Sequence, residues 1–400
     1  MDASLTLGSG HKSVPPRLWG RSAASVVADG LRLSELQTPI MTFDRAAAAA
    51  NVNALVEWAR DAGIDLAPHG KTTMSPELWH RLLDAGCWGI TLATPWQVQV
   101  ARAAGVPRVL LANELSDPVA IDWLSAELDA HADFEFACWV DSVEGVALLA
   151  ASTGSRPIDV LVEVGDAGGR TGARGQAAAK AVADAVAASP RLRLRGVAGY
   201  EGSYGPDRSD ASIARVRQYL RELVALFDEL SAAGVLVEPM LTAGGSAWFD
   251  VVAEEFAPVA GRAQLVVRAG AFQAHDDIFY TGISPFAGTP RQFRPALHTW
   301  ARLVSRPEPT LALLDAGKRD VPSDLDLPIV HGVPGARVTS LADQHAFLSL
   351  PADSTLAVGD VVRLGISHPC TAFQLWRLLP EIDDAQAEDP RVVGFVETVF

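Results

Sequence analysis

The sequence has few cysteines, little positive charge and no long uninterrupted apolar run. Its three cysteines are Cys87, Cys138 and Cys370. An odd number at these spacings fits neither a disulfide framework nor a four-ligand zinc module, and it favours a reducing, cytoplasmic location. No apolar region resembles a secretory signal, and no run is long enough to cross a bilayer. We therefore expect a cytoplasmic protein.

The charge and length narrow the class of protein further. The formal net charge is −15, which argues against nucleic acid or an anionic membrane as a partner, since both require basic surface. An anionic small ligand stays allowed, because a few N–H groups and one or two cations can bind it. The chain has 400 residues, of which 49% are apolar and 20% charged. These values predict a packed globular protein of two domains.

From residue 44 onward, short apolar runs alternate with amphipathic stretches. Continuous apolar strands joined by helical crossovers predict a parallel sheet covered on its outer side. About eight strands match a (β/α)8 TIM barrel, and an open doubly wound sheet is the alternative. The predicted strands are Ile64–Pro68, Gly89–Ala93, Arg108–Asn113, Phe134–Val140, Asp159–Val164, Gly196–Tyr200, Pro239–Thr242 and Leu265–Arg268.

Beyond residue 285 the alternation stops, and proline and glycine become frequent. The short apolar runs that remain predict a separate, mostly β domain. The predicted organisation is therefore an N-terminal segment 1–43 that packs on the β domain, a barrel at 44–284, and a C-terminal β domain at 285–400.

Reactive groups in such a barrel stand at the C-terminal ends of its strands. Lys71 follows the first strand, where partial desolvation would favour the neutral amine needed for Schiff-base chemistry. Most loop lysines are merely solvated, which is the simpler interpretation. Arg170 follows the fifth strand in a glycine-rich turn, and Tyr200 ends the sixth. A solvated arginine and a structural tyrosine are the corresponding alternatives.

The seventh strand ends in Thr242-Ala243-Gly244-Gly245-Ser246, and the eighth in Arg268-Ala269-Gly270-Ala271. A Gly-Gly turn leading into a helix presents N–H groups to an anion, and barrels often bind phosphate here. In the second domain, His368 and Cys370 are two residues apart, so in an extended chain they share one side and would suit zinc. A buried His and Cys without metal are the common alternative.

Together these segments resemble the D-serine dehydratase and D-threonine aldolase family of fold-type III pyridoxal-phosphate (PLP) enzymes, which have an alanine-racemase-like barrel. The resemblance runs from about residue 38 to 385. It depends on the order and spacing of several short motifs. These are Pro68-His69-Gly70-Lys71-Thr72, Leu111–Glu114, Val164-Gly165 with Arg170-Thr171-Gly172, Gly199–Gly202, Gly244–Ser246, Asp315–Gly317, and Asp343–His345 with His368-Pro369-Cys370.

The resemblance implies a role for each matching residue. Lys71 would bind PLP covalently and would be the catalytic base at the substrate's α carbon. Arg170 and Tyr200 would hold the cofactor ring. The phosphate would be bound by Thr242, Gly244, Gly245 and Ser246, with backbone at Gly270 and Ala271. His368 and Cys370 would bind Zn2+ or another divalent metal.

The His-x-Cys pair resembles the dehydratase branch, so we expect β-elimination of a small 3-hydroxy D-amino acid to a keto acid and ammonia. Aldolase members usually carry His-x-Asp, and retro-aldol cleavage is the alternative. A racemase ranks lower, because none of the four tyrosines lies in the second domain. A non-catalytic PLP-binding protein would resemble the barrel alone.

Thr73-Met74 stands where many members have His-Lys, which predicts a less polar pocket. The resemblance also implies a homodimer.

Overall fold

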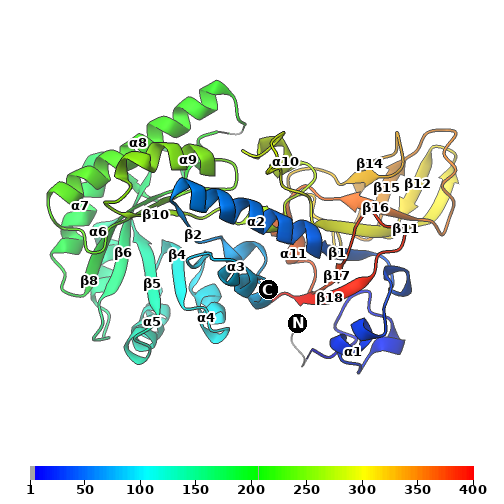
Figure 1. The fold of residues 1–400 in the computed structure, drawn as a ribbon, viewed down its shortest axis with the longest axis horizontal. Coiled ribbons are helices and arrows are strands. Elements are labelled where there is room, and N and C mark those ends of the chain that lie inside the picture. The colour runs from blue at the N-terminus through cyan, green and yellow to red at the C-terminus, as the bar shows by residue number, and fades with distance from the viewer. Residues whose placement is uncertain (1–4, 206) are drawn as a thin grey trace. The chain divides into compact units, whose positions relative to one another are not determined.

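The computed structural model describes residues 5–205 and 207–400. The chain forms two compact units, each built from segments that are distant in sequence (Figure 1). The barrel unit comprises Val56–Lys71 and Trp79–Gly270. The β unit comprises the described residues up to Leu55, together with Thr72–Leu78 and Ala271–Phe400. The domain limits at residues 43/44 and 284/285 stay a prediction from sequence.

The strands of the barrel unit are all parallel and follow the order β2-β10-β9-β8-β6-β5-β4-β3. The N–H groups of Trp88 and Thr91 donate to the carbonyls of Leu66 and Pro68, at 2.8 and 2.9 Å, which joins β3 to β2 and closes the sheet. This confirms the (β/α)8 barrel. The strands are β2 (Asp65–Leu66), β3 (Ile90–Leu92), β4 (Arg108–Glu114), β5 (Glu135–Val140), β6 (Ile158–Gly165), β8 (Leu192–Gly199), β9 (Met240–Ala243) and β10 (Gln264–Val267). The short β7 (Ala173–Arg174) pairs with β6.

Helices alternate with these strands, and several of the helices begin at an N-cap residue whose side chain accepts a backbone hydrogen bond. The side chains of Thr94, Asp117, Ser142 and Ser209 each accept a backbone N–H in the first turn of the helix that follows. The helices are α2 (Arg45–Ala62), α3 (Pro76–Asp84), α4 (Pro95–Ala103), α5 (Pro118–Ala130), α6 (Val143–Ala150), α7 (Gly175–Ala187), α8 (Asp210–Ala232) and α9 (Phe249–Phe256).

The interior of the barrel is packed rather than hollow. Alternate residues of the strands point inward, and one cluster joins small and large side chains. Its buried members are Ala67, Leu110, Ala137, Trp139, Leu161, Ala198, Met240 and Val266. The largest of these side chains, Trp139, is almost fully buried among them.

The β unit is a largely antiparallel sheet of order β14-β15-β12-β11-β1-β17-β18, with β16 pairing both β11 and β13. This confirms the mostly β second architecture. Its strands are β1 (Ile40–Asp44), β11 (Leu297–Glu308), β12 (Leu311–Leu314), β13 (Ile329–His331), β14 (Arg337–Leu341), β15 (Ala346–Ser349), β16 (Val361–Gly365), β17 (Leu378–Ile382) and β18 (Val392–Glu397). Its helices are α1 (Ala23–Ala28), α10 (Phe279–Ile283) and α11 (Pro369–Phe373).

The N-terminal residues contribute to the core of the β unit. Leu5, Leu7 and Val26 belong to one buried cluster with Leu378 and Phe395. Among the described residues, no helix is both long and apolar enough to span a membrane.

Candidate active site

Lys71 lies in a single helical turn, η3 (Gly70–Thr72), directly after β2, and it is half-buried. Two neighbours fix this turn. The indole N–H of Trp79 donates to the carbonyl of Gly70 at 3.0 Å. A Cβ on Gly70 would lie 2.7 Å from the same indole nitrogen, so only glycine fits. The lysine predicted from sequence is therefore held at the C-terminal end of a barrel strand.

Three cations surround the neighbouring His69. Burial, together with the charges of Lys71, Arg268 and Arg170, holds the pKa of His69 well below its usual range. The imidazole is therefore neutral, and its Nδ1 is buried without a hydrogen-bond partner in the described chain. Cations gathered around a neutral ring favour an anionic ligand at this end of the barrel.

Arg268 is buried and connects three strand ends. Its guanidinium donates to the hydroxyl of Thr242 at 2.6 Å and to the carbonyl of Gly199 at 2.7 Å. It also lies over the Trp139 indole, 5.3 Å from the ring centroid. Burial lowers the pKa of Arg268, and the nearby carboxylates of Glu201 and Glu163 act in the opposite direction. From sequence we assigned Arg268 no role of its own, because its burial cannot be seen there.

The Gly-Gly turn after β9 binds an anion from within the chain. The N–H groups of Gly244 and Gly245 donate to the two carboxylate oxygens of Glu201, at 2.9 Å for Gly244. Gly244 has a φ of +109°, a conformation that favours glycine. The turn thus has the predicted preference for an anion, and phosphate binding by Thr242, Gly244, Gly245 and Ser246 stays a prediction. A phosphate would have to share or replace the Glu201 contacts.

The remaining predicted phosphate contacts lie at Gly270 and Ala271. A Cβ on Gly270 would lie 2.7 Å from the backbone oxygen of His69, so the glycine allows the two segments to approach closely. Ala271 is buried and belongs to the β unit.

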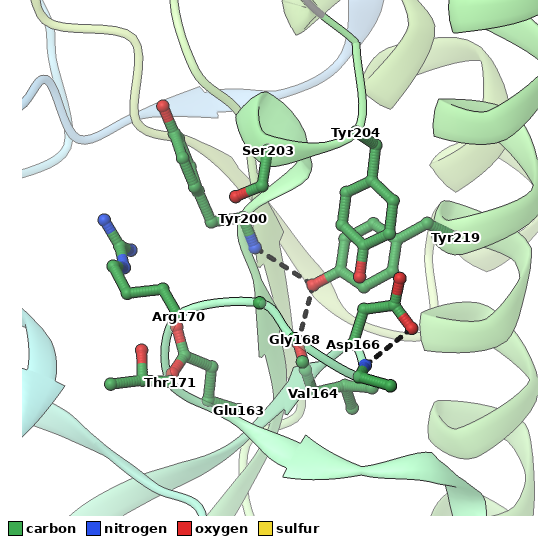
Figure 2. A pocket seen from close by; sticks show the side chains of 13 residues that line it. Glu163, Val164, Asp166, Gly168, Arg170, Thr171, Tyr200, Ser203, Tyr204 and Tyr219 are labelled. Atoms are coloured by element: carbon green, nitrogen blue, oxygen red, sulfur yellow. Dashed lines mark hydrogen bonds between the residues drawn. The ribbon is translucent and has the colours of Figure 1, made fainter.

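Arg170 and Tyr200 meet at a cavity of about 240 Å3 at the ends of β6 and β8 (Figure 2). The guanidinium carbon of Arg170 is 4.9 Å from the centroid of the Tyr200 ring. Beside them, the Tyr219 hydroxyl donates to the carbonyl of Val164 at 2.6 Å and accepts the Tyr200 N–H at 3.0 Å. Tyr204 stacks on Tyr219 with centroids 4.3 Å apart. Arg170 and Tyr200 therefore lie together beside two stacked tyrosines, and their role in holding the cofactor ring stays a prediction.

Two carboxyl groups share the polar end of the barrel. Glu114 ends β4, and Glu163 is a buried residue of β6. Burial raises the pKa of Glu114 to about 8, and the proximity of Glu163 and Asp141 contributes to the increase. Glu114 therefore retains its proton at neutral pH. From sequence we assigned no role to either glutamate. Their strands β4 and β6 are separated by β5 in the sheet, so the proximity of the two side chains was not expected.

In the β unit, the structure brings His368 and Cys370 together with Asp324. His368 precedes α11, and its Nδ1 lies 2.6 Å from Asp324 Oδ2. The Thr371 hydroxyl donates to the other oxygen of Asp324 at 2.7 Å. Cys370 Sγ is 3.2 Å from the Thr72 hydroxyl. Burial lowers the pKa of His368, but its contacts with Cys370 and Asp324 raise it to about 9.

This group fits a divalent metal. Asp324 engages Nδ1 and so leaves Nε2 of His368 for a metal, the arrangement in which a carboxylate orients a ligating imidazole. The Cys370 thiol supplies a soft donor. No motif in the sequence pointed to Asp324, which lies 44 residues from His368.

A lysine after the first strand of a (β/α)8 barrel, near cations and an anion-binding Gly-Gly turn, defines the class of PLP-binding, alanine-racemase-like barrels. The family model "Alanine racemase, N-terminal domain" matches residues 43–258. The model "Putative serine dehydratase domain" matches residues 296–382. The chain therefore belongs to the alanine racemase N-terminal domain family, and within it to the D-serine dehydratase and D-threonine aldolase group of fold-type III enzymes.

Similar proteins cover almost the whole chain. A D-threonine aldolase of Arthrobacter sp. is 27% identical over 362 residues, which are 89% of this chain and 92% of the relative. A 3-hydroxy-D-aspartate aldolase of Paracoccus denitrificans (strain Pd 1222) is 27% identical over 352 residues, covering 85% and 87%. The crystal structure of D-threonine aldolase from Filomicrobium marinum matches with a TM-score of 0.79 at 24% identity, covering 91% of this chain and 97% of that one. This last likeness confirms the fold.

Proposed function

We propose that this protein is a PLP-dependent lyase that cleaves 3-hydroxy-D-amino acids by a retro-aldol reaction. The observation that carries the proposal is the placement of Lys71 at a barrel strand end, next to His69 and among the charges of Arg170 and Arg268. The similarity to two curated aldolases over at least 85% of the chain supports this reaction type.

The chain's own residues would hold and orient the reactants. PLP, when bound, supplies an electron sink for the electrons left on the substrate's α carbon. Lys71 would hold the cofactor aldehyde, and Arg170 with Tyr200 would flank its ring. Because His69 is neutral, it would accept or donate a hydrogen bond without adding charge beside the lysine.

The β unit would supply the metal ligands. A divalent metal, when bound, supplies a Lewis acid for the substrate's β-hydroxyl. His368 and Cys370 would ligate it, and Asp324 would fix the imidazole through Nδ1. Open coordination positions would remain for water or substrate.

The retro-aldol reaction balances without a further reactant. The Cα–Cβ bond breaks, the β-hydroxyl loses its proton to become an aldehyde, and the α carbon gains a proton. The products are glycine and an aldehyde. Dehydration, in contrast, removes the hydroxyl and yields a keto acid and ammonia.

Dehydration is the second candidate, and one observation favours it. Cys370 stands beside His368, so the ligand pair includes a thiol, which prefers zinc to harder metals. That choice matches our sequence-based expectation of a dehydratase. The curated relatives favour cleavage instead, so we place the aldolase reaction first.

Product analysis separates the two reactions. The PLP-loaded protein is incubated with D-threonine, 3-hydroxy-D-aspartate and D-serine, with and without a chelator, and the L-isomers are controls. We expect glycine and an aldehyde from a D-substrate only, and loss of activity with the chelator. Keto acid and ammonia without glycine would establish the dehydratase instead. No product from any D-substrate would contradict both.

A matched variant pair tests the metal ligands. Cys370→Asp keeps a ligand and exchanges thiolate for carboxylate, whereas His368→Ala removes one. We expect His368→Ala to abolish metal-dependent activity, and Cys370→Asp to retain cleavage with a preference for harder metals. Equal activity of the His368→Ala variant and the wild type would contradict a metal role for this pair.

A further inference from the structure

Three further side chains of the β unit bring ligand atoms together. Asp277, His298 and His331 each offer one ligand atom, and these atoms all lie within 4.8 Å of one another. Asp277 Oδ1 is 3.0 Å from His331 Nε2, and Asp277 Oδ2 is 4.0 Å from His298 Nε2. The side chains are largely buried, with exposed fractions of 8% for Asp277, 4% for His298 and 25% for His331.

The strand register explains why these residues meet. β16 lies between β11 and β13, and Gly365 of β16 pairs with His298 on one side and with Ile329 on the other. His331 is two residues beyond Ile329, so its side chain points to the same face of the sheet as that of His298. The N–H of Asp277 donates to the carbonyl of Ile366 at 3.1 Å, which fixes the carboxylate at the end of β16.

Gly365 leaves the space that the three side chains fill. A Cβ at this position would lie 2.4 Å from Asp277 Oδ2 and 2.7 Å from His331 Nε2. Any other residue would therefore displace the carboxylate or the imidazole.

The three polar groups are not satisfied by one another or by their surroundings. Asp277 Oδ2 and His331 Nε2 are buried and have no hydrogen-bond partner in the described part of the chain, and on His298 the buried atom without a partner is Nδ1, the ring nitrogen other than the one measured from Asp277. The 3.0 Å contact between Asp277 and His331 is close enough for a hydrogen bond, but its atoms are not oriented as one. Buried polar groups without partners are costly, and a cation bound between Asp277 and His331 would satisfy the lone pairs of both.

The charge of Arg363 acts on Asp277, but its guanidinium makes its hydrogen bonds elsewhere. Arg363 pairs with His331 across the sheet, and its guanidinium donates to the carbonyl of Ala385 and to Gln386 Oε1, the latter at 3.0 Å. These acceptors hold the arginine, so it does not bond to the Asp277 carboxylate.

We propose that Asp277, His298 and His331 form a second site for a divalent transition metal, one that shares no ligand with the His368–Cys370 pair. Two imidazoles and one carboxylate are a three-ligand set that binds Zn2+ and leaves a fourth position open. Tetrahedral ligands at zinc distances stand about 3.3 Å apart, and the observed separations of 3.0 and 4.0 Å bracket that value. Nitrogen donors favour Zn2+, Co2+ or Ni2+ over Mg2+. The metal would tie β11 and β13 to the segment that leads into α10.

Cobalt titration of the full-length protein, stripped with a chelator, distinguishes this site from the first pair. Thiolate-bound Co2+ absorbs strongly by charge transfer, whereas a site of nitrogen and oxygen ligands does not. We expect the wild type to bind two Co2+ per chain. His331→Gln should bind one and keep the thiolate absorption. Cys370→Ser should lose that absorption and still bind one Co2+ at the proposed site. His131→Gln, at an exposed histidine, is the matched control and should bind two.

If His331→Gln and His298→Gln bind as many Co2+ ions as the wild type, or if the Cys370→Ser protein binds none, the site does not exist. Failure of the His368–Cys370 pair would instead remove the thiolate absorption from the wild type and leave the binding in Cys370→Ser unchanged.

A thermal measurement covers variants that fold poorly. In a Cys370→Ser background, Zn2+ should raise the unfolding temperature, and adding His331→Gln should abolish that increase. Mg2+ should have no effect in either protein. An equal increase with Zn2+ in both proteins would contradict the proposal.

Discussion

The barrel mouth and the β unit differ in whether particular buried polar side chains have hydrogen-bond partners. In the barrel, two buried charged side chains have partners within the chain: Arg268 is held by Thr242 and Gly199, and Glu201 is held by the N–H groups of Gly244 and Gly245. In the β unit, Asp277, His298 and His331 have buried atoms that find no partner among the described residues. The first arrangement has an excess of cations around His69 and suits an anion. The second offers lone pairs and suits a metal cation.

The largest expected effect that tests this comparison is on stability. Arg268→Met removes a buried guanidinium and with it the positive charge that acts on the carboxylates of Glu201 and Glu163. We expect the free energy of unfolding to fall by about 3 kcal/mol. Denaturant unfolding of the variant and the wild type measures this.

Arg262→Met is the control for that variant. Arg262 pairs with Asp228 at 2.8 Å, but both side chains are about half exposed. Exposed pairs contribute about 0.5 kcal/mol, so this variant should be nearly neutral. Equal losses in the two variants would show that burial of Arg268 has no special importance.

A smaller effect is expected on metal affinity when Asp324 is changed, which tests the metal-binding role of the β unit. Asp324→Asn weakens the carboxylate that orients His368, and such changes typically reduce metal affinity about 10- to 100-fold. PLP binding should be unchanged. Isothermal titration with Zn2+ measures the affinity, and Asp326→Asn, two residues away, is the control. An unaltered affinity in Asp324→Asn would mean that His368 needs no such support.

The smallest expected effect is the change in stability with pH that Glu114 causes, at most about 1.4 kcal/mol per pH unit. Glu114 has a pKa of about 8 in the folded protein, above its ordinary value of 4.5, because it is buried. Between these values the folded state binds more protons than the unfolded state, so stability falls as the pH rises. Glu114→Gln should flatten that decline. Parallel stability curves for the variant and the wild type would contradict the raised pKa.

The barrel was readable from sequence because its strands are short, apolar and regularly spaced. Lys71, Arg170 and Gly244 each follow such a strand, so their common location followed from the topology. Glu114 and Glu163 were missed, because only the closed sheet shows that both are close enough to share a proton.

The β unit was less predictable, for physical reasons. β11 was not predicted, because Arg302 and Arg306 interrupt its apolar pattern and only the sheet supplies its partners. β17 was also not predicted, because Pro380 interrupts it, and β14 was not predicted, because most of its side chains are exposed. His298 and His331 meet through antiparallel register across β16, which no local pattern encodes.

The most direct test of the central claim is chemical reduction of the PLP-loaded protein with borohydride, followed by peptide mass spectrometry. Reduction fixes the cofactor to the side chain that holds it. We predict a pyridoxyl adduct on Lys71 and its loss in Lys71→Ala, whereas Lys180→Ala, at an exposed lysine of α7, keeps it. An adduct on another lysine, or no adduct in the wild type, would contradict the account.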